Sequence, residues 1–405
     1  MKGILVVNDF TIHPIIDGGR VRLFNIYKNI SKEFNVKYIC LGDAQKIQED
    51  IISENFRVVI IPKKLLYRMI CIIAEKILRC PVNDFIALFL APYNRDLKRI
   101  IKDQNFNCDI VFFSHPYLYP AVMPLIAKNK MIIYEALNVE YPLKKSILGE
   151  GIIKEIMLKR LKLTENDLLK RCDLCFSMSE YDKNQLAQLY KINPSKIFVA
   201  PNGVNADDYN DFFPQDNRHK ANGNRSPMIL FIGSGHPPNI IAARQIIKNI
   251  APRVPNALFV IAGGVCVQLK NEWMGENVKL LNFLPDDEKK ELFRSTDIAI
   301  NPMMSGSGTN LKMLDYMAAG IPVISTPIGA RGIDIIDHQH ALVCEILEFP
   351  NQISCLLGDK NLYNKLSVNG RNLIKEKYEW KTIACSIIVT INREIKRNKS
   401  LYQRT

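Results

Sequence analysis

Gly306, Gly308, Lys312 and Asp315 stand at spacings that suit the binding of phosphate and hydroxyl groups. The two glycines fall in a loop that the pattern predicts to enter a helix near Asn310. A helix N-terminus points several backbone N–H groups at one spot and so attracts anions. Lys312 can reach the same anion from the first helical turn, and Asp315 lies on the same helical face. Such a cation and carboxylate suit a nucleoside diphosphate, although the spacing equally allows an ordinary capping loop with a solvated lysine.

A second glycine-rich segment follows the first apolar run of the chain. Gly18 and Gly19 are predicted to lie in a loop ahead of a helix beginning near Val21. Paired glycines allow a backbone to approach a ligand closely. Arg20 and Arg22 add positive charge beside them. The pattern alone also fits an ordinary turn between a strand and a helix.

His115 comes just after an apolar run, at the predicted carboxyl end of a strand. Ligands of parallel α/β proteins bind at this edge of the sheet, so we expect His115 to face a bound molecule. A surface or capping histidine is the alternative that the sequence leaves open.

Short apolar runs alternate with helical patterns along the chain and fall into two series. Continuous apolar strands separated by helices predict parallel sheets that are covered on both faces, so two series predict two Rossmann-like α/β domains. The first series of expected strands is 3–8, 58–62, 110–113, 131–134, 174–178 and 197–200. The second series is 228–232, 258–262, 278–282, 298–301, 322–325 and 341–344.

A turn cluster at residues 201–205, followed by polar sequence to about Ser226, predicts the boundary between the domains. The expected domains are residues 1–200 and 201–377, with a final basic helix over 378–405. Nicotinamide dehydrogenases and P-loop enzymes are disfavoured, because the glycine motif that each class requires is absent.

Composition and charge limit the class of partner. The chain has 405 residues, enough for two cores, with 47% hydrophobic and 23% charged residues. It has no apolar stretch of membrane-spanning length, and its first residues resemble a buried strand rather than a signal peptide, so we expect a cytoplasmic protein. Residues 1–200 carry 30 Lys/Arg against 21 Asp/Glu, which supplies +9 of the net charge of +13. This excess predicts an anionic partner, and a membrane surface fits better than nucleic acid because no nucleic-acid motif is present.

Residues 65–79 form an apolar segment in which Arg68, Glu75 and Arg79 fall on one side of a helix. One interpretation is a helix packed on the first sheet. The other is an interfacial helix that seats the protein on a membrane, which the basic charge favours.

Cys172 and Cys175 have the spacing of a zinc or redox pair among the ten cysteines of the chain. No second pair or histidine cluster accompanies them, so we interpret them as buried thiols.

The segment 301–332 resembles the donor-site motif of GT-B glycosyltransferases, in particular glycosyltransferase family 4. That motif reads Gly-x-Gly-Thr-x-x-Lys-x-x-(Glu/Asp), followed by Met-Ala-x-Gly-x-Pro-Val-Ile. The matching residues are Gly306, Gly308, Thr309, Lys312, Asp315, Met317, Ala318, Gly320, Pro322, Val323 and Ile324. The resemblance implies two Rossmann-like domains facing a central cleft, with the C-terminal helix crossing back to the first domain.

The same resemblance implies roles for single residues. The expected catalytic residues are His115, which would contact the transferred sugar, and Lys312, which would stabilise the leaving diphosphate. The expected donor-binding residues are Gly19, Gly233, Ser234, Gly306, Gly308, Thr309, Asn310 and Asp315. The expected acceptor-side residues are Arg20, Arg22, Asn138 and Glu140.

The sequence departs from the family pattern at three places. Leu137 replaces a histidine, and Ser307 stands where many members have a glutamate. The loop after Gly233 lacks the Arg and Lys that neutralise diphosphate in many members, so that charge would fall mainly on Lys312. No Asp-x-Asp metal motif occurs, and we expect neither a metal site nor a cofactor beyond the donor itself.

The resemblance implies a retaining transfer of sugar from a nucleotide-diphosphate sugar to a glycan or lipid-linked saccharide, in surface polysaccharide synthesis. The expected partners are therefore a nucleotide sugar, such an acceptor and an anionic membrane surface. A nucleotide-sugar epimerase with the same fold and a catalytically silent partner subunit are the alternatives.

Overall fold

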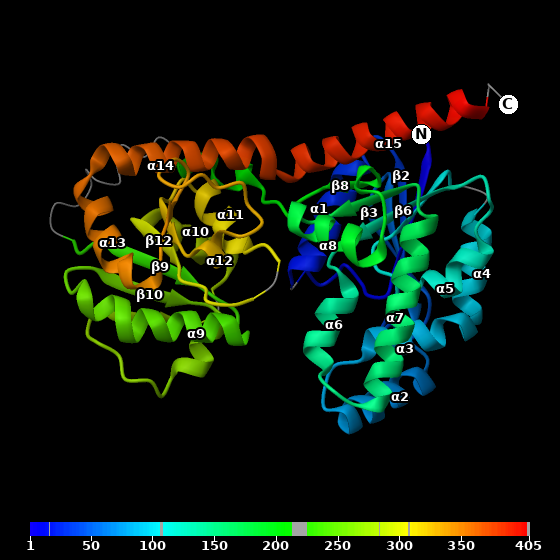
Figure 1. Ribbon diagram of the computed structural model, residues 1–405, viewed down its shortest axis with the longest axis horizontal. Coiled ribbons are helices and arrows are strands. Elements are labelled where there is room, and N and C mark those ends of the chain that lie inside the picture. The colour runs from blue at the N-terminus through cyan, green and yellow to red at the C-terminus, as the bar shows by residue number, and fades with distance from the viewer. Residues whose placement is uncertain (16, 106–107, 213–224, 283, 307, 403–405) are drawn as a thin grey trace. The chain divides into compact units, whose positions relative to one another are not determined.

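The computed structural model describes residues 1–15, 17–105, 108–212, 225–282, 284–306 and 308–402 (Figure 1). It divides into two compact units. Unit 1 comprises Met1–Pro201 with Ile383–Thr405, and unit 2 comprises Asn202–Thr382.

Unit 1 is built on an eight-stranded sheet with the strand order β3-β4-β2-β1-β5-β6-β7-β8. The strands are β1 (Gly3–Asn8), β2 (Asn35–Gly42), β3 (Gln48–Ser53), β4 (Phe56–Pro62), β5 (Ile110–Phe113), β6 (Met131–Ala136), β7 (Leu174–Ser177) and β8 (Ile197–Val199). The α-helices are α1 (Gly18–Ile30), α2 (Leu65–Leu78), α3 (Asn83–Leu90), α4 (Arg95–Asn105), α5 (Tyr119–Val122), α6 (Glu140–Leu148), α7 (Ile152–Arg171), α8 (Glu180–Tyr190) and α15 (Trp380–Tyr402).

The central strands of this sheet are buried on both faces. Every residue of β1 is buried, and Val6 lies beside Tyr38 of β2 and Phe112 of β5 in parallel register. This burial is why the strand reads as a continuous apolar run, as parallel sheets require. The expected all-parallel sheet is wrong at one edge, because β3 pairs with β4 in antiparallel register.

Unit 2 contains a six-stranded parallel sheet with the order β11-β10-β9-β12-β13-β14. The strands are β9 (Met228–Ile232), β10 (Leu258–Ala262), β11 (Val278–Leu281), β12 (Ile298–Asn301), β13 (Val323–Ser325) and β14 (Leu342–Val343). The α-helices are α9 (Pro237–Gln245), α10 (Asp286–Ser295), α11 (Leu311–Ala318), α12 (Pro327–Ala330), α13 (Phe349–Gly358) and α14 (Lys360–Leu373).

Successive side chains of β9 enter two different cores of unit 2. Ile229 and Phe231 pack with Ile247 on one face of the sheet, and Leu230 packs with Leu314 on the other. Because neighbouring residues of a strand point to opposite faces, helices cover both sides of this sheet. The predicted α/β architecture with two parallel-sheet, Rossmann-like bodies is confirmed.

The C-terminal helix α15 belongs largely to unit 1, since its residues from Ile383 onward group with that unit. The guanidinium group of Arg393 lies 5.4 Å from the centre of the Phe198 ring. The return of this helix to the first body, which the resemblance implied, is therefore confirmed. Among the described residues, no helix is both long enough and apolar enough to cross a membrane.

Candidate active site

The glycine loop that follows β12 is held in place by a second turn of unit 2. Gly306 and Gly308 have φ angles of +130° and +69°, a backbone region that other residues rarely adopt. The Arg331 side chain donates a hydrogen bond to the Gly306 carbonyl oxygen (2.7 Å), and Asn310 donates to the Gly329 carbonyl oxygen (3.1 Å). The loop is thus fixed on both sides of Ser307, which itself lies outside the described residues.

Thr309 completes this attachment. A Cβ atom on Gly332 would lie only 2.6 Å from Thr309 Oγ1, and Gly332 also has a φ of +81°. Glycine is therefore required at position 332 for the two loops to touch. Gly332 ends the segment 301–332 and had no expected role.

Helix α11 begins directly after the loop and leaves its N-terminus without a side-chain cap. Asn310 occupies the cap position, but its amide bonds to Gly329 instead of to the helix. The first backbone N–H groups of a helix have no partner within the helix, and they carry a partial positive charge. This N-terminus is consequently suited to an anion.

Lys312 lies in that first turn and is half-buried. Its Nζ donates to Asn239 Oδ1 (2.7 Å) and lies 4.3 Å from the centre of the Phe231 ring. No ion pair to Lys312 occurs within the described parts of the chain. Burial without an opposing charge lowers the pKa of Lys312 to about 7.

Asp315, one turn further along α11, is held by two other elements. Its Oδ1 accepts a hydrogen bond from the Tyr209 hydroxyl group (3.0 Å), and its Oδ2 forms an ion pair with Lys289 (3.0 Å). The carboxylate remains partly exposed, with 26% of the side chain accessible. It is fixed in position and still accessible to hydroxyl groups.

Gly233 and Ser234 lie in the loop after β9, close to Lys312. The Ser234 hydroxyl accepts a hydrogen bond from Asn239 Nδ2 (3.0 Å), and Asn239 in turn accepts the Lys312 bond. Asn239 thereby joins two expected site residues, Ser234 and Lys312. Helix α9 begins at Pro237, and Asn239 is its third residue.

A glycine pair after β10 packs against this loop. The sequence-based prediction did not include this pair in the site. A Cβ atom on Gly263 would lie 2.6 Å from the Gly233 carbonyl oxygen, and one on Gly264 would lie 3.2 Å from the Gly235 nitrogen. Only glycine allows the loops after neighbouring strands to approach this closely. The sequence does carry a signal for this pair, because the apolar run 258–262 is followed directly by two glycines.

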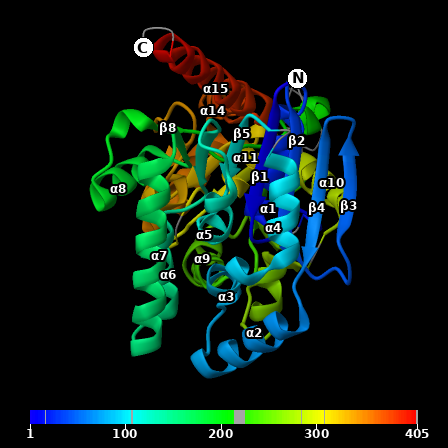
Figure 2. The ribbon, with the colours of Figure 1, turned by 90° about the vertical axis from the view of Figure 1, so that its right-hand side faces the viewer.

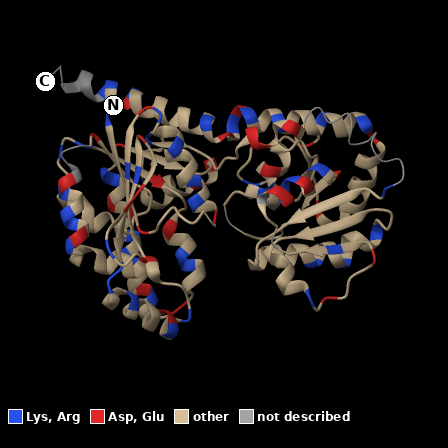
Figure 3. Ribbon diagram, turned by 180° about the vertical axis from the view of Figure 1, so that it is seen from behind, with Lys and Arg blue, Asp and Glu red and all other residues tan. Residues whose placement is uncertain are grey.

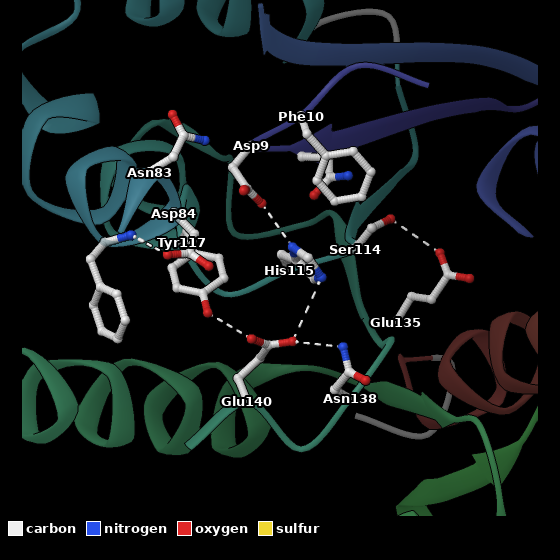
Figure 4. Close-up of polar contacts among 12 residues, drawn as sticks. Asp9, Phe10, Asn83, Asp84, Ser114, His115, Tyr117, Glu135, Asn138 and Glu140 are labelled. Atoms are coloured by element: carbon white, nitrogen blue, oxygen red, sulfur yellow. Dashed lines mark hydrogen bonds and ion pairs between the residues drawn. The ribbon is translucent and has the colours of Figure 1, made fainter. Parts of the chain in front are cut away.

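The candidate site of unit 1 is centred on His115, just after the end of β5 (Figure 4). His115 Nδ1 lies 2.8 Å from Asp9 Oδ1, and Nε2 lies 3.7 Å from Glu140 Oε1. Burial alone would lower the pKa of His115, but the charges of Asp9 and Glu140 more than reverse this and raise it to about 9. The ring is therefore an imidazolium at neutral pH. Asp9, which directly follows β1, had no expected role.

Glu140 and Asn138 follow β6, the next strand in the sheet (Figure 4). Glu140 accepts hydrogen bonds from the Tyr117 hydroxyl group (2.6 Å) and from Asn138 Nδ2 (3.2 Å). The backbone N–H of Glu140 donates to the buried Glu165 carboxylate (2.9 Å), which occupies the N-terminus of α6. The structure thus brings the predicted His115, Asn138 and Glu140 together.

A further ion pair lies beside this group. Lys144 of α6 pairs with Asp84 of α3, and both side chains are mostly buried. Burial raises the pKa of Asp84, with Lys144 opposing the rise and Asp9 and Glu140 adding to it. Asp9, Asp84 and Glu140 therefore share one electrostatic environment with His115 and Lys144. We call these five residues the His115 cluster.

Arg22 is placed differently from the expectation. It is 1% exposed, its Nε bonds to Glu135 Oε1 (3.1 Å), and its Nη1 donates to the Pro201 carbonyl oxygen. Burial lowers the pKa of Arg22, and Glu135 opposes this change. Engaged in this way, Arg22 does not present its guanidinium group to a ligand in this structure.

Gly18 and Gly19 form the start of α1 rather than a loop, which corrects the predicted beginning near Val21. Asp17 caps this helix by accepting a hydrogen bond from the Arg20 backbone N–H (2.9 Å). The Arg20 side chain pairs with Asp17 and also donates to the Thr11 carbonyl oxygen (2.9 Å). An acidic side chain therefore already occupies the helix N-terminus that the paired glycines were expected to offer.

Comparison with known proteins agrees with the architecture. The family described as Glycosyltransferase Family 4 matches residues 16–208, and the family described as Glycosyl transferases group 1 matches residues 226–359. The chain belongs to the group 1 and family 4 glycosyltransferases. Each family matches one of the two parallel-sheet bodies.

Several solved GT-B structures share the fold of this family 4 chain. A sucrose-phosphate synthase from Thermosynechococcus elongatus superposes with a TM-score of 0.71 at 14% identity, covering 98% of this chain and 100% of the other. Anabaena HepE in complex with UDP and glucose superposes with a TM-score of 0.66 at 13% identity, covering 97% of this chain and 100% of the other. At these identities the likeness establishes the fold, and the GT-B expectation is confirmed.

The curated sequence relatives match a smaller part of this chain than the solved structures do. A protein of the cps region of Klebsiella pneumoniae is 28% identical over 39% of this chain and 44% of its own length. A D-inositol 3-phosphate glycosyltransferase of Mycobacterium leprae is 25% identical over 48% of this chain and 47% of its own length. The family 4 chain spans about half the length of the curated relatives it matches.

The Cys172 and Cys175 pair is buried and unbonded, as interpreted from the sequence. Burial raises the pKa of Cys172 to about 12, so the thiol is unreactive at neutral pH. Within the described residues, no group of three His, Cys, Asp or Glu side chains is arranged to hold a metal ion.

Proposed function

We propose that this family 4 protein transfers a glycosyl group from a nucleoside diphosphate sugar to a hydroxyl group of an acceptor. The observation that carries the proposal is Lys312, a half-buried cation without an ion pair in the described structure, at the uncapped N-terminus of α11. A diphosphate supplies the negative charge that this arrangement lacks. Asp315, on the same helix, would accept hydrogen bonds from the ribose hydroxyl groups.

The reaction exchanges one bond for another at the anomeric carbon. The bond between this carbon and the diphosphate oxygen breaks, and a bond to the acceptor oxygen forms. The acceptor hydroxyl proton passes to the leaving diphosphate, so that the products are a nucleoside diphosphate and a glycoside. Lys312 and the α11 N-terminus would stabilise the negative charge that develops on the leaving group. We further propose that the anomeric configuration is retained and that no metal ion takes part.

Uridine is the base to test first. The solved structure of Anabaena HepE, which shares this fold, contains UDP and glucose. Gly233, Ser234, Gly306, Gly308, Thr309 and Asn310 would shape the backbone around the phosphates.

The His115 cluster is the proposed acceptor side, together with the predicted residues Arg20 and Asn138. Its three carboxylates exceed its two cations by one charge. Carboxylates and an imidazolium suit hydroxyl groups, whereas excess negative charge repels phosphate. We therefore propose an uncharged glycan end, free or lipid-linked, as the acceptor. The relative from the Klebsiella cps region makes surface polysaccharide synthesis the first setting to examine.

Acceptor-dependent turnover tests the proposal. Purified protein is incubated with UDP-glucose and other nucleotide sugars, with and without short uncharged oligosaccharides, and released nucleoside diphosphate is measured with and without EDTA. The proposal predicts release that requires the acceptor and persists in EDTA. Donor turnover that ignores the acceptor would instead indicate hydrolysis or epimerisation. Absence of turnover with every donor and acceptor pair would favour a silent subunit.

A further inference from the structure

Helix α2 of unit 1 presents its apolar face away from the protein. Six large aliphatic side chains of this helix are exposed by 50–74%. These residues are Leu65, Leu66, Met69, Ile72, Ile73 and Ile77. At 100° per residue they fall within an arc of about 140°. The helix therefore has one apolar side that no described residue of unit 1 covers.

The polar side of α2 points toward the protein instead. Arg68 donates hydrogen bonds to the Lys63 carbonyl oxygen (3.1 Å) and the Asp43 carbonyl oxygen (2.9 Å). Glu75 accepts a hydrogen bond from the Val82 backbone N–H (3.3 Å). An ordinary surface helix has the opposite arrangement, with charges in water and aliphatic groups in the core. The packed-helix interpretation from the sequence accounts for only one side of α2.

A second apolar group lies where α6 ends and α7 begins. Ile147, Ile152, Ile153 and Ile156 are exposed by 48%, 80%, 57% and 60%. Exposed single aliphatic residues are normal on protein surfaces, but four isoleucines within ten residues form a group.

Both apolar groups lie at the same end of unit 1. Figures 1 and 2 show α2 and the junction of α6 and α7 at one end of the unit in two perpendicular views. Helix α3 joins them, since it packs against both α2 and α7. The two groups therefore form one surface, which we call the α2–α7 surface.

Positive charge accompanies this surface. Residues 64–79 contain four Lys/Arg and one Asp/Glu, and residues 145–160 contain four Lys/Arg and two Asp/Glu (Figure 3). Lys76 stands within the exposed apolar arc of α2. Two copies of such a surface would repel each other, whereas an anionic lipid surface would attract it. We infer that the α2–α7 surface docks the protein onto an anionic membrane, with the aliphatic side chains entering the headgroup boundary.

Docking at this end also places the acceptor side near the lipid. Helix α2 follows the carboxyl end of β4, and α6 follows that of β6. The His115 cluster lies at the carboxyl ends of β1, β5 and β6 in the same sheet. A lipid-linked acceptor could thus reach the cluster from the membrane. This last step rests on the proposed function, whereas membrane docking itself does not.

Co-sedimentation of the full chain with vesicles tests the inference. Vesicles of phosphatidylcholine alone are compared with vesicles that contain 30 mol% phosphatidylglycerol (roughly the fraction that gives a strong surface potential). The variants are Ile72→Asp/Ile77→Asp in α2 and Ile152→Asp/Ile156→Asp at the α6–α7 junction. Leu347→Asp, at a 72% exposed position in unit 2, is the matched control.

We expect the wild type to bind the anionic vesicles and each double variant to bind at least about tenfold more weakly, because each loses two buried aliphatic contacts. The control should bind like the wild type. An Ile73→Trp variant should show a blue shift of its fluorescence on anionic vesicles, which shows that the helix itself enters the lipid.

Equal sedimentation of wild type and both double variants would overturn the inference. So would a dimer, seen by light scattering, that the double variants abolish, since a second copy would then cover the surface. Nucleotide binding by unit 2 is measured in parallel. A protein that binds nucleotide but not vesicles contradicts docking alone, and a protein that binds vesicles but not nucleotide contradicts the proposed function alone.

Discussion

The two candidate sites differ in whether their charged side chains have partners of opposite charge. In unit 1, His115 lies between Asp9 and Glu140, and Lys144 pairs with Asp84, so every charge of the cluster has a neighbour of opposite sign. Among the described residues of unit 2, the half-buried Lys312 is held only by the neutral amide of Asn239 and by the aromatic ring of Phe231. The first arrangement orients its groups before a ligand arrives. The second leaves a positive charge for a ligand to neutralise.

The largest effect on stability is expected at the buried ion pair of Arg22 and Glu135 in unit 1. Glu135→Ala would leave the buried Arg22 guanidinium group without its carboxylate, and such a change costs about 3–5 kcal/mol. We expect the free energy of unfolding of unit 1, measured in urea, to fall by this amount. Arg99→Ala, which breaks the exposed pair with Asp96 in the same unit, should cost under about 1 kcal/mol. Similar losses in both variants would contradict the distinction.

The His115 cluster should make the stability of unit 1 depend on pH. His115 keeps its proton up to about pH 9 in the folded protein but loses it near 6.5 when unfolded. Its stabilising contribution is therefore complete below about pH 6.5 and is lost as the pH rises through about 9. The shift corresponds to at most about 3 kcal/mol. Urea unfolding at pH 6 and pH 9.5 measures it.

Asp9→Asn supplies the matched comparison for this pH dependence. The variant keeps the shape of the side chain but removes the charge that holds the proton on His115. The loss of stability between the two pH values should be markedly smaller than in the wild type. An unchanged loss would show that other groups cause it.

Unit 2 should respond to pH through ligand affinity instead. Lys312 has a pKa of about 7 without a partner, and a bound diphosphate would restore its charge. The affinity for UDP-glucose should therefore decrease by roughly tenfold for each pH unit above about 7. Lys312→Arg stays charged and should show a flat profile. Calorimetry between pH 6 and 9 measures both proteins, and parallel profiles would refute the role of the lysine proton.

The smallest expected effect concerns the residue that positions Lys312. Asn239→Ala removes the acceptor of the Lys312 hydrogen bond and the link to Ser234. We expect donor affinity to weaken by about 0.5–1.5 kcal/mol, the usual value of one hydrogen bond. Asn249→Ala, at an exposed position in the same unit, is the control. A loss larger than that of Lys312→Ala would mean that Asn239 contacts the donor itself.

Local pattern predicted the strands and the glycine loop, because each depends on residues close together in the chain. The strands 3–8, 110–113, 228–232, 258–262 and 298–301 agree with the structure to the residue. Strands β2 and β3 were missed, since Lys37 interrupts the apolar run of one and β3 lies at an exposed edge. Edge strands carry a weak apolar signal because one side faces water.

The partners within each site could not be predicted in this way. Asp9, His115 and Glu140 are more than twenty residues apart from one another, and only the order of strands β1, β5 and β6 brings them together. Asn239 and Lys312 are likewise joined by the packing of separate loops. The burial of Arg22 could not be predicted either, because nothing in the sequence indicates its ion pair with Glu135.

The most direct test of the account is calorimetric titration of UDP and UDP-glucose into the wild type, Lys312→Ala and the surface control Lys270→Ala. The loss of one charge-assisted contact predicts that Lys312→Ala binds about 1.5–3 kcal/mol more weakly, or roughly 10- to 150-fold, while the control is unchanged. Equal affinity in all three proteins would contradict the claim that the uncompensated lysine of α11 marks the donor site.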